Sequence, residues 1–463
     1  MRQRLGSALG LLLALVTLGD LAAAEVPTPP ATERAMTLRE AVDHAHLHHE
    51  RLLAARRRLI AAQREADVPG AQWLPRVGAF AQVIGATTNN STTTLLGVST
   101  VDIPRIGATR IESKADFSPS PSTAIAVGVR QQIYDFGRVA AESAAASLMA
   151  NIERSRGESV ALDVDFFVEQ AYYAVLAATA VEGASRGAFE RATAHRDLAR
   201  ANVTTGLRPP IELTRAEADV ARYEAGMTRA RGALRVARAV FAASAAVDDT
   251  ELGAAGAPPE ALALPSLVDV LRRAEASPSV REVRDRVLAQ RGETRRLDTQ
   301  NRPVLYGTAA VNGRAGGATP SAGPVPSGDG WVPLVPNYDV GVVLAWPILE
   351  PTWDRRADAS RERERALEAE SALALREQRL AITAAWQEAE ITGLTLAALE
   401  RGADAARANY EQAEQRFRVG LGTSTEVADA QALRTEADIQ LAIGRFQKAR
   451  ARVVLARVTA EAR

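Results

Sequence analysis

Two helical stretches of unusual length constrain the fold of this chain more than any other feature. Residues 138–204 and 354–418 carry a helical pattern without a strong break, and they hold 67 and 65 residues. At 1.5 Å per residue each would form a helix of about 100 Å, which soluble domains rarely need. Because alanines on every face would let such helices pack closely on both sides, we expect a wall of long, paired helices.

A tight turn follows each long stretch. In the second half Gly420 and Gly422 can take the positive φ that ends a helix, and Ser424 or Thr425 can cap the next helix. A similar sequence lies 214 residues earlier, where Gly206 is followed by prolines that can start a helix. The matching turns predict an internal duplication.

Each half also opens with a shorter helical pattern and two strands. The shorter patterns cover residues 38–72 and 267–301, and the strands cover about 73–86, 123–134, 302–314 and 338–348. The helices before the strands and after the turns, residues 38–72 and 210–247, hold about 35 to 38 residues each, and two of them placed end to end would match one long helix in length. We therefore expect a signal peptide (residues 1–24), a first structural repeat (residues 25–250) and a second structural repeat (residues 251–463), with polar loops rich in Thr, Ser, Gly and Pro between the strands.

The clearest strands alternate with a period of two. In residues 123–134 the large apolar side chains share one face, and Arg130 and Gln132 lie on the other; residues 338–348 place Val340, Val342 and Leu344 together in the same way. An apolar face opposite a small or polar face suits a strand between lipid and an aqueous lumen. Because two hairpins cannot close a barrel, and open sheet edges are not tolerated in lipid, oligomerisation is expected.

Aromatic side chains mark the ends of these strands. They lie at the strand-to-helix junctions, where amphipathic rings favour a membrane interface: Trp73, Tyr134, Phe136, Trp346 and Trp353. This position predicts that the helices lie on one side of a membrane and the polar loops on the other.

The N-terminus and the composition narrow the class of protein. Arg2 and Arg4 precede an apolar run and three alanines, which predicts a secretory signal peptide removed after Ala24. The chain has no cysteine, so it has neither disulfides nor thiol chemistry. Lysine plus arginine equal aspartate plus glutamate at 56 each, so no basic field indicates nucleic acid. No nucleophile-base motif or phosphate loop is present, so we expect neither an enzyme nor a cofactor.

Several short motifs, in their order and spacing, resemble the TolC family of outer-membrane efflux and secretion channels. They are Met36–Val42, Trp73–Pro75, Gln132–Arg138, Gln170–Leu176 and the two Gly-Leu turns. The resemblance implies a mainly α protein with a membrane β-barrel part, built from a duplicated helix-strand-strand-helix-helix unit. Its long coiled hairpins would form a periplasmic tunnel, and four strands per chain would join a shared, trimeric, twelve-stranded barrel in the cell outer membrane.

The resemblance also implies a function. The homotrimer would be the passive exit duct of a tripartite efflux system, docked on a periplasmic membrane-fusion adaptor and a proton-driven or ATP-driven inner-membrane pump. Two alternatives stay open: the outer-membrane component of type I protein secretion, which shares this architecture, and a periplasmic coiled-coil scaffold, which would leave the alternating strands unexplained.

Site residues are carried over from the same family. The turns would form an adaptor-docking tip, and an ordinary helix-hairpin turn is the alternative: Thr205, Gly206, Leu207, Val419, Gly420 and Leu421. The tunnel entrance would include Glu212, Phe417, Glu426 and Asp429. Three copies of each carboxylate would attract cations, although acids at a helix N-terminus also simply suit the dipole. Gly422 replaces the gate arginine of the family and Phe417 replaces a hydrogen-bonding tyrosine, which puts the inter-helix lock in doubt.

The histidines form one further cluster. His44 and His48 stand one helical turn apart, as a pair of metal ligands could. A hydrated helix face is the preferred interpretation, and we expect no metal.

Overall fold

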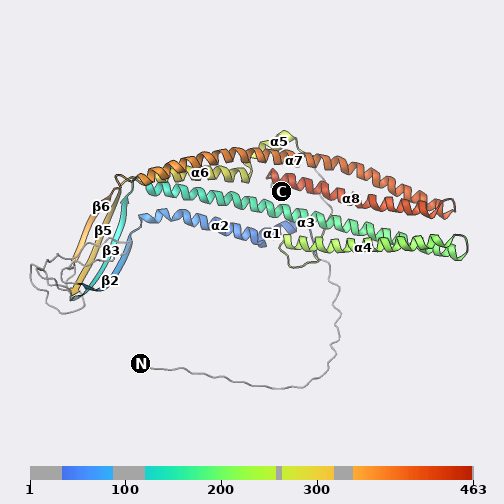
Figure 1. Ribbon diagram of the computed structural model, residues 1–463, viewed down its shortest axis with the longest axis horizontal. Coiled ribbons are helices and arrows are strands. Elements are labelled where there is room, and N and C mark those ends of the chain that lie inside the picture. Colours follow the sequence, from blue (N-terminus) through green and yellow to red (C-terminus); the bar gives the residue numbers. More distant parts are fainter. Residues whose placement is uncertain (1–33, 87–119, 257–262, 317–336, 461–463) are drawn as a thin grey trace, which may run out of the picture.

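The computed structural model describes residues 34–86, 120–256, 263–316 and 337–460. The chain is a long bundle of helices with a four-stranded sheet at one end (Figure 1) and a separate two-stranded parallel sheet. The predicted signal peptide and most of the predicted polar loops lie outside the described residues. Among the described helices, none is both long enough and apolar enough to span a membrane.

The elements follow one another in two similar series. The helices are α1 (Leu38–His48), α2 (Glu50–Asp67), α3 (Arg138–Thr204), α4 (Pro210–Ser244), α5 (Leu267–Arg272), α6 (Pro278–Asp298), α7 (Pro351–Arg418) and α8 (Ser424–Val458). The strands are β1 (Ala35–Met36), β2 (Arg76–Ala86), β3 (Ser120–Tyr134), β4 (Gly253–Ala254), β5 (Val304–Gly316) and β6 (Asn337–Ala345). Short 3₁₀ helices cover Pro69–Trp73 and Arg273–Ala276.

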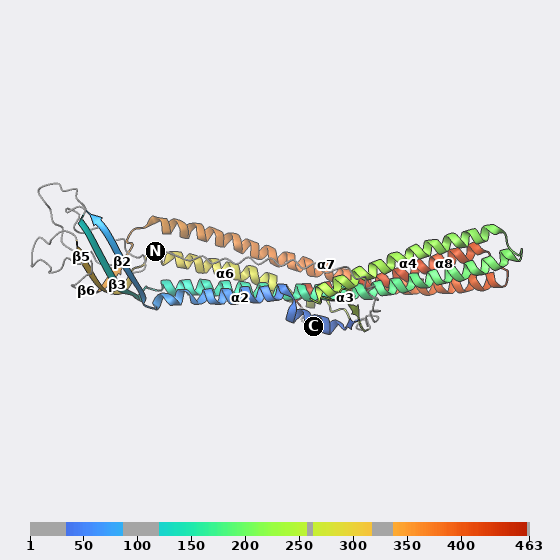
Figure 2. The ribbon, with the colours of Figure 1, turned by 90° about the horizontal axis from the view of Figure 1, so that it is seen from below.

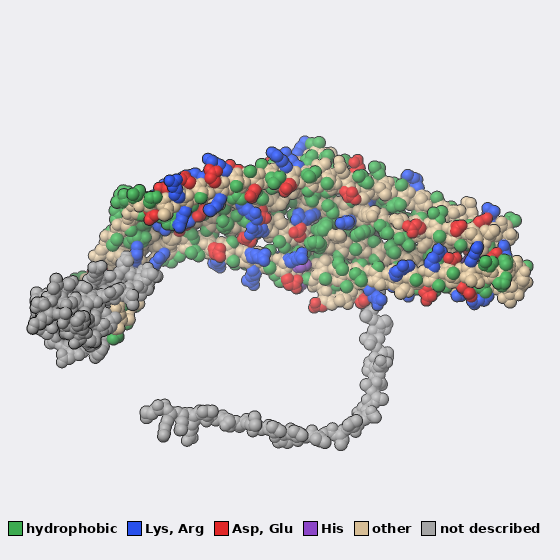
Figure 3. All heavy atoms as spheres, in the orientation of Figure 1, with side chains coloured by type: hydrophobic (Ala, Val, Ile, Leu, Met, Phe, Trp, Pro, Cys, Tyr) green, Lys and Arg blue, Asp and Glu red, His purple; other side chains and the backbone are tan. Residues whose placement is uncertain are grey.

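The two long helices form the frame of the molecule. Helix α3 has 67 residues and α7 has 68, so the prediction of two very long helices is confirmed. Helices α2 and α4 pack along α3, and α6 and α8 pack along α7 (Figures 1 and 2). Helix α3 also contacts α6 and α8, and these contacts join the two series side by side. Apolar side chains and charges of both signs are interspersed over the visible surface of the bundle (Figure 3).

The shorter helical patterns are interrupted, and the prediction of one continuous helix in each is wrong. The first breaks at His49, whose φ of −69° and ψ of 124° are extended and whose Nδ1 accepts the N–H of Arg51, so that it caps α2. The second breaks at Ser277, because Pro278 occupies the first position of α6, where a missing N–H costs least. The pattern predicted to run to residue 247 ends at Ser244.

The sheet has the antiparallel order β2-β3-β5-β6. Its register places Val77 opposite Val129, Val127 opposite Val311, and Ala309 opposite Val340. Because side chains alternate across a strand, these pairs assemble one apolar face. Its exposed members include Val77, Val83, Ile125, Val127, Val311, Val340, Val342 and Leu344. The opposite face carries Arg76, Arg130 and Asp339, so the two-faced pattern predicted for β3 and β6 is confirmed.

The largest apolar core lies mid-bundle, where α1 and the segment after α4 pack on α3. Val168, Tyr172 and Phe241 are buried there, and the Tyr172 hydroxyl donates to the carbonyl oxygen of Ala255 at 2.7 Å. Burial raises the pKa of Tyr172. The motif Gln170–Leu176 therefore contributes side chains to the core.

Candidate functional site

The end of the bundle farthest from the sheet is formed by two helix-hairpin turns (Figure 1). In the first turn Gly206 has a φ of +73°. Its N–H donates to the carbonyl oxygen of Val203 at 3.0 Å, and the N–H of Leu207 donates to that of Asn202 at 2.9 Å. This pair of bonds is the Schellman arrangement, which satisfies the last carbonyls of α3.

The second turn repeats this arrangement. Gly420 has a φ of +79°, and its N–H donates to the carbonyl oxygen of Phe417 at 3.0 Å. The N–H of Leu421 donates to the carbonyl oxygen of Arg416 at 2.9 Å. The two turns thus share both their backbone conformation and their hydrogen bonds, 214 residues apart.

Two local predictions at the second turn are wrong. Gly422 does not take a positive φ. A Cβ at this position would lie 3.0 Å from the backbone nitrogen of Phe417, so the absence of a side chain lets the backbone of the turn approach the end of α7 closely. The next helix is capped by Thr423, whose side chain accepts the N–H of Glu426 at 3.2 Å, and not by Ser424 or Thr425. Because α8 begins one residue earlier than expected, Ser424 lies inside its first turn.

The turns present apolar side chains to solvent. We define the tip surface as Thr205, Gly206, Leu207, Val419, Gly420 and Leu421. Its three apolar side chains, Leu207, Val419 and Leu421, are all largely exposed. Clustered exposed apolar side chains are typical of a protein interaction surface.

Arg208 joins the two hairpins directly. Its Nη2 donates to the carbonyl oxygen of Gly422 at 3.2 Å, and its Nη1 lies 3.5 Å from Oε1 of Glu212. The guanidinium carbon lies 5.5 Å from the centre of the Phe417 ring. Arg208 was not predicted from the sequence, where its position two residues after Gly206 was the only signal. An arginine from one hairpin therefore reaches the turn of the other.

Phe417, predicted at the entrance, packs inside this chain. It is buried with Tyr410, Val427 and Ala430, and its ring centre lies 5.1 Å from that of His195. His195 Nε2 lies 3.0 Å from the Ser424 hydroxyl, so this histidine also connects the two hairpins.

The predicted entrance carboxylates occupy different surroundings. Glu212 faces Arg208, and its Oε2 is buried without a hydrogen-bond partner among the described residues. Glu426 and Asp429 are exposed on the first turns of α8, and within the described ranges no cation pairs with either. The structure thus brings Glu212 into the contact between the hairpins and leaves the other two carboxylates free to face solvent.

His44 and His48 lie away from the tip. Their rings stack with centres 4.3 Å apart; Nδ1 of His44 lies 2.8 Å from the carbonyl oxygen of Ala245, and Nδ1 of His48 lies 3.0 Å from that of His44. His46 pairs with Asp165 at 2.5 Å. Among the described residues no group of three or more metal-ligating side chains surrounds them. These contacts fasten α1 to the long helix and to the end of α4.

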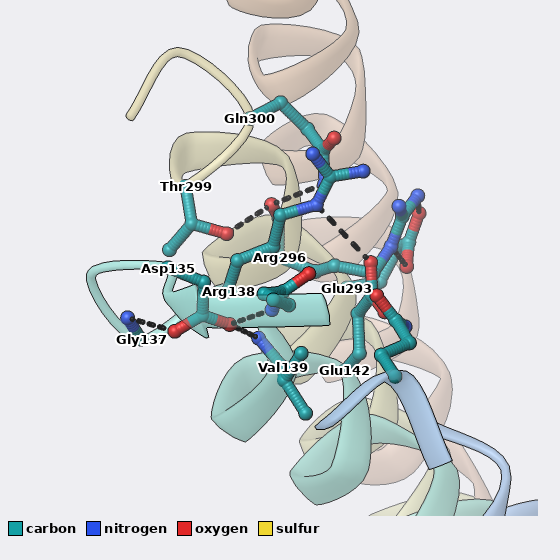
Figure 4. Close-up of polar contacts among 11 residues, drawn as sticks. Asp135, Gly137, Arg138, Val139, Glu142, Glu293, Arg296, Thr299 and Gln300 are labelled. Carbon is teal, nitrogen blue, oxygen red and sulfur yellow. Dashed lines mark hydrogen bonds and ion pairs between the residues drawn. The ribbon is translucent and has the colours of Figure 1, made fainter. Parts of the chain in front are cut away.

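A second polar cluster lies at the opposite end, where β3 becomes α3 (Figure 4). Asp135 is buried; its Oδ1 accepts the N–H of Gly137 at 3.0 Å and its Oδ2 accepts the N–H of Val139 at 2.6 Å. Phe136 and Gly137 have φ values of 54° and 91°. Asp135 therefore satisfies the first turn of α3 at the sharp bend that sends the chain from the sheet into the bundle.

Asp135→Ala is expected to loosen this bend. The change leaves the N–H groups of Gly137 and of the buried Val139 without this acceptor, at a cost of about 1–2 kcal/mol. Hydrogen exchange of the amides of residues 137–141 should accelerate by about tenfold. Asp354→Ala, which removes an exposed acid from the first turn of α7, is the matched control and should change exchange little. Equal acceleration in both variants would contradict the assigned role.

The tip is expected to be less stable in mild acid because of His195. Burial lowers the pKa of His195, and Asp219, Glu212 and Glu414 offset part of that effect. As the pH falls below about 6.5, the histidine of the unfolded chain takes up a proton, whereas folded His195 stays neutral because its pKa is lower. The free energy of unfolding is therefore highest above pH 6.5 and decreases as the pH falls toward the lowered pKa. Protection factors of the amides at the turns, which correct for the intrinsic pH dependence of hydrogen exchange, should therefore be lower at pH 5.5 than at pH 7.5. His195→Gln should reduce this difference, and an unchanged difference would exclude His195 as its source.

Residues 41–246 match the family model described as outer membrane efflux protein. VceC from Vibrio cholerae has a TM-score of 0.70 at 16% identity, with 91% of this chain and 95% of that chain covered. The outer-membrane channel CmeC from Campylobacter jejuni has a TM-score of 0.72 at 14% identity, with 91% and 85% covered.

A third solved structure belongs to the same fold. The open state of the outer-membrane channel MtrE from Neisseria gonorrhoeae has a TM-score of 0.69 at 16% identity, with 93% of each chain covered. No curated protein sequence matches this chain. At these identities the solved structures establish the fold alone.

Proposed function

We propose that this chain is an outer-membrane protein with a large periplasmic part and the passive exit duct of a tripartite efflux system. Its residues 41–246 match the outer membrane efflux protein family. Proteins of this family are channels rather than enzymes. They act in efflux systems together with adaptors and inner-membrane pumps. The observation that carries the proposal is the two-faced sheet attached to a bundle built on two very long helices.

The sheet supports assembly of several chains. Strands β2 and β6 are its two edges, and their outer backbone groups would need hydrogen-bond partners in lipid. Pairing β2 of one copy with β6 of the next satisfies both edges. Three copies would close a twelve-stranded barrel, with the apolar face toward lipid and the face of Arg130 toward the bore. The homotrimer would then continue into a periplasmic tunnel formed by the helices.

The chain organisation follows the same proposal. Residues 1–24 would be removed on export, and residues 25–250 and 251–463 would be two structural repeats. The matching hydrogen bonds at Gly206 and Gly420 support the repeats, as do the two strands of the four-stranded sheet and the one long helix that each half contributes.

The tip surface would be the docking site of the periplasmic adaptor. Leu207, Val419 and Leu421 are exposed at the end of the molecule most distant from the sheet. Burying such side chains in a partner would remove apolar area from water. The contact of Arg208 with Gly422 would hold the two turns in a fixed relation until the partner binds.

Glu426 and Asp429 would line the entrance with Glu212. Threefold symmetry would gather three copies of each carboxylate around a narrow bore, where low-dielectric walls focus their field on passing ions. Glu426→Gln with Asp429→Asn should therefore lower cation preference and weaken block by multivalent cations in planar-bilayer recordings. Because these exposed carboxylates contribute little to folding, trimer stability should stay nearly unchanged.

The alternative role of these acids gives the opposite result. If they only complement the dipole of α8, the double variant should lose a few tenths of a kcal/mol to about 1 kcal/mol of helix stability per residue and keep its selectivity. Unaltered selectivity in an assembled variant would remove Glu426 and Asp429 from the entrance.

The proposed function is tested by efflux from living cells. Cells that lack the protein should accumulate a fluorescent efflux substrate, and re-expression should reverse the accumulation. An unchanged level of the substrate together with loss of a secreted protein would favour a protein-secretion duct. No change in either process would contradict a transport role.

A further inference from the structure

A pocket lies where the sheet meets the helices, on the sheet face opposite the apolar one. It has a volume of about 340 Å³, and three arginines, Arg76, Arg130 and Arg138, line it with Glu142, Tyr306 and two glutamines. The register of β2, β3 and β5 places Arg76, Arg130 and Tyr306 on this face. Arginine is therefore the dominant side chain of a concave site that the duct function has not explained.

Two of these arginines stand directly opposite each other. Arg76 of β2 is the cross-strand partner of Arg130 of β3. Like charges in this position destabilise a sheet, so the pair has a cost that an anion between them would relieve. The guanidinium carbon of Arg130 lies 3.8 Å from the centre of the Tyr306 ring, which fixes its place in the pocket.

Glu142, the one carboxylate among the residues that line the pocket, already has polar partners. Glu142 Oε2 accepts a hydrogen bond from Nε2 of Gln72 at 2.6 Å. Oε1 of Glu142 lies 3.6 Å from Nε of Arg138, and Figure 4 shows the side chains of Glu142 and Arg138. Nε of Arg138 is nevertheless buried without a hydrogen-bond partner in the described part of the chain. Over the same ranges, no carboxylate pairs with Arg76. Arg76 and Arg138 therefore keep donors for an added anion.

We propose that this pocket binds anionic solutes that carry a carboxylate or a phosphate. The planar guanidinium fork matches either group in a bidentate way. The inference rests on the proposed function, because only the duct places this face toward the bore. The pocket would then select anions at the base of the barrel, at the opposite end from the carboxylates of the tip.

The ligand is a dissolved anion and not a lipid headgroup. Lipid would meet the apolar face, which carries Val77, Val127 and Val340, and the pocket opens on the other face. A solute in the bore reaches Arg76 without crossing the sheet.

Binding is tested on the purified full-length chain in neutral detergent, with inorganic phosphate and citrate as probes in calorimetric titrations. Arg76→Gln should weaken both by about tenfold, and Arg76→Lys should weaken them less because it keeps the charge and loses the fork. Arg355→Gln is the matched control, since it removes an exposed arginine from the start of α7 at the same end of the molecule. Equal affinity in Arg76→Gln and wild type, or equal weakening in the control, would overturn the proposal.

Conduction separates this inference from the function on which it rests. In planar bilayers of zwitterionic lipid, the reversal potential of Arg76→Gln in a salt gradient should shift toward cations, and adding phosphatidylglycerol should leave this shift unchanged. A conducting protein that binds neither probe would overturn the anion site and leave the duct intact. A protein that binds phosphate but never conducts would overturn the duct, and with it the placement of the pocket in a bore. A shift abolished by phosphatidylglycerol would assign the pocket to lipid headgroups.

Discussion

Val342→Arg is expected to abolish stable assembly, whereas Val343→Arg, one residue further along β6, is expected to assemble. Val342 lies on the apolar face and is 66% exposed; Val343 lies on the opposite face and is 42% exposed. An arginine facing lipid near the bilayer centre costs about 2–4 kcal/mol per chain, and every copy in an oligomer would carry it. On the opposite face the same side chain would enter the aqueous bore.

The two variants form a matched pair. They change the same residue type in the same strand, so a general effect of arginine on β6 would appear in both. Trimer yield from outer-membrane fractions, measured by native gel and mass, is the readout. Ala126 also lies on the polar side but is buried, and an arginine there would test packing rather than orientation. Equal loss of trimer from Val342→Arg and Val343→Arg would show that the face assignment is wrong.

Leu207→Ser combined with Leu421→Ser is expected to abolish efflux while leaving the assembled protein intact. The two leucines are 74% and 75% exposed at the tip surface. Full burial of an exposed leucine side chain is worth about 1.5–3 kcal/mol, which corresponds to roughly tenfold or more in affinity for each. Because neither side chain packs in a core, assembly should not require them.

The readouts are trimer yield, binding of the purified adaptor to the purified protein, and substrate accumulation in cells. Leu394→Ser is the control, since Leu394 is 72% exposed on α7 and lies far from either turn. Adaptor affinity that stays at the wild-type level in the assembled double variant would exclude the tip surface as the docking site.

The parts of the fold that depend on local pattern were predictable from the sequence. Helix α3 has the bounds of the stretch 138–204 from which it was predicted. Glycines at the ends of the long helical stretches predicted the two turns. Alternation of apolar side chains with a period of two predicted that Val127 and Val340 lie on an apolar face. These features can be predicted from the sequence because the residues that determine them are neighbours along the chain.

The contacts that build the tip were not predictable in the same way. Arg208 with Gly422 and His195 with Ser424 join residues 214 and 229 positions apart, and no local pattern marks them. The break at His49 depends on one side chain accepting one backbone N–H. Capping at Thr423 differs from the expected position by one residue, which is within the ordinary uncertainty of helix ends. Asp135 stood in a noted motif, but its role required the bend at Phe136 to be seen.

We propose above all that copies of this chain close a pore through the outer membrane. Single-channel recording of the purified, full-length protein in planar bilayers, with its mass measured in the same detergent, tests that claim most directly. We predict steady ion conduction by particles with the mass of three chains, and loss of both properties in Val342→Arg. A monomeric protein that never conducts would contradict the account and would favour a periplasmic scaffold.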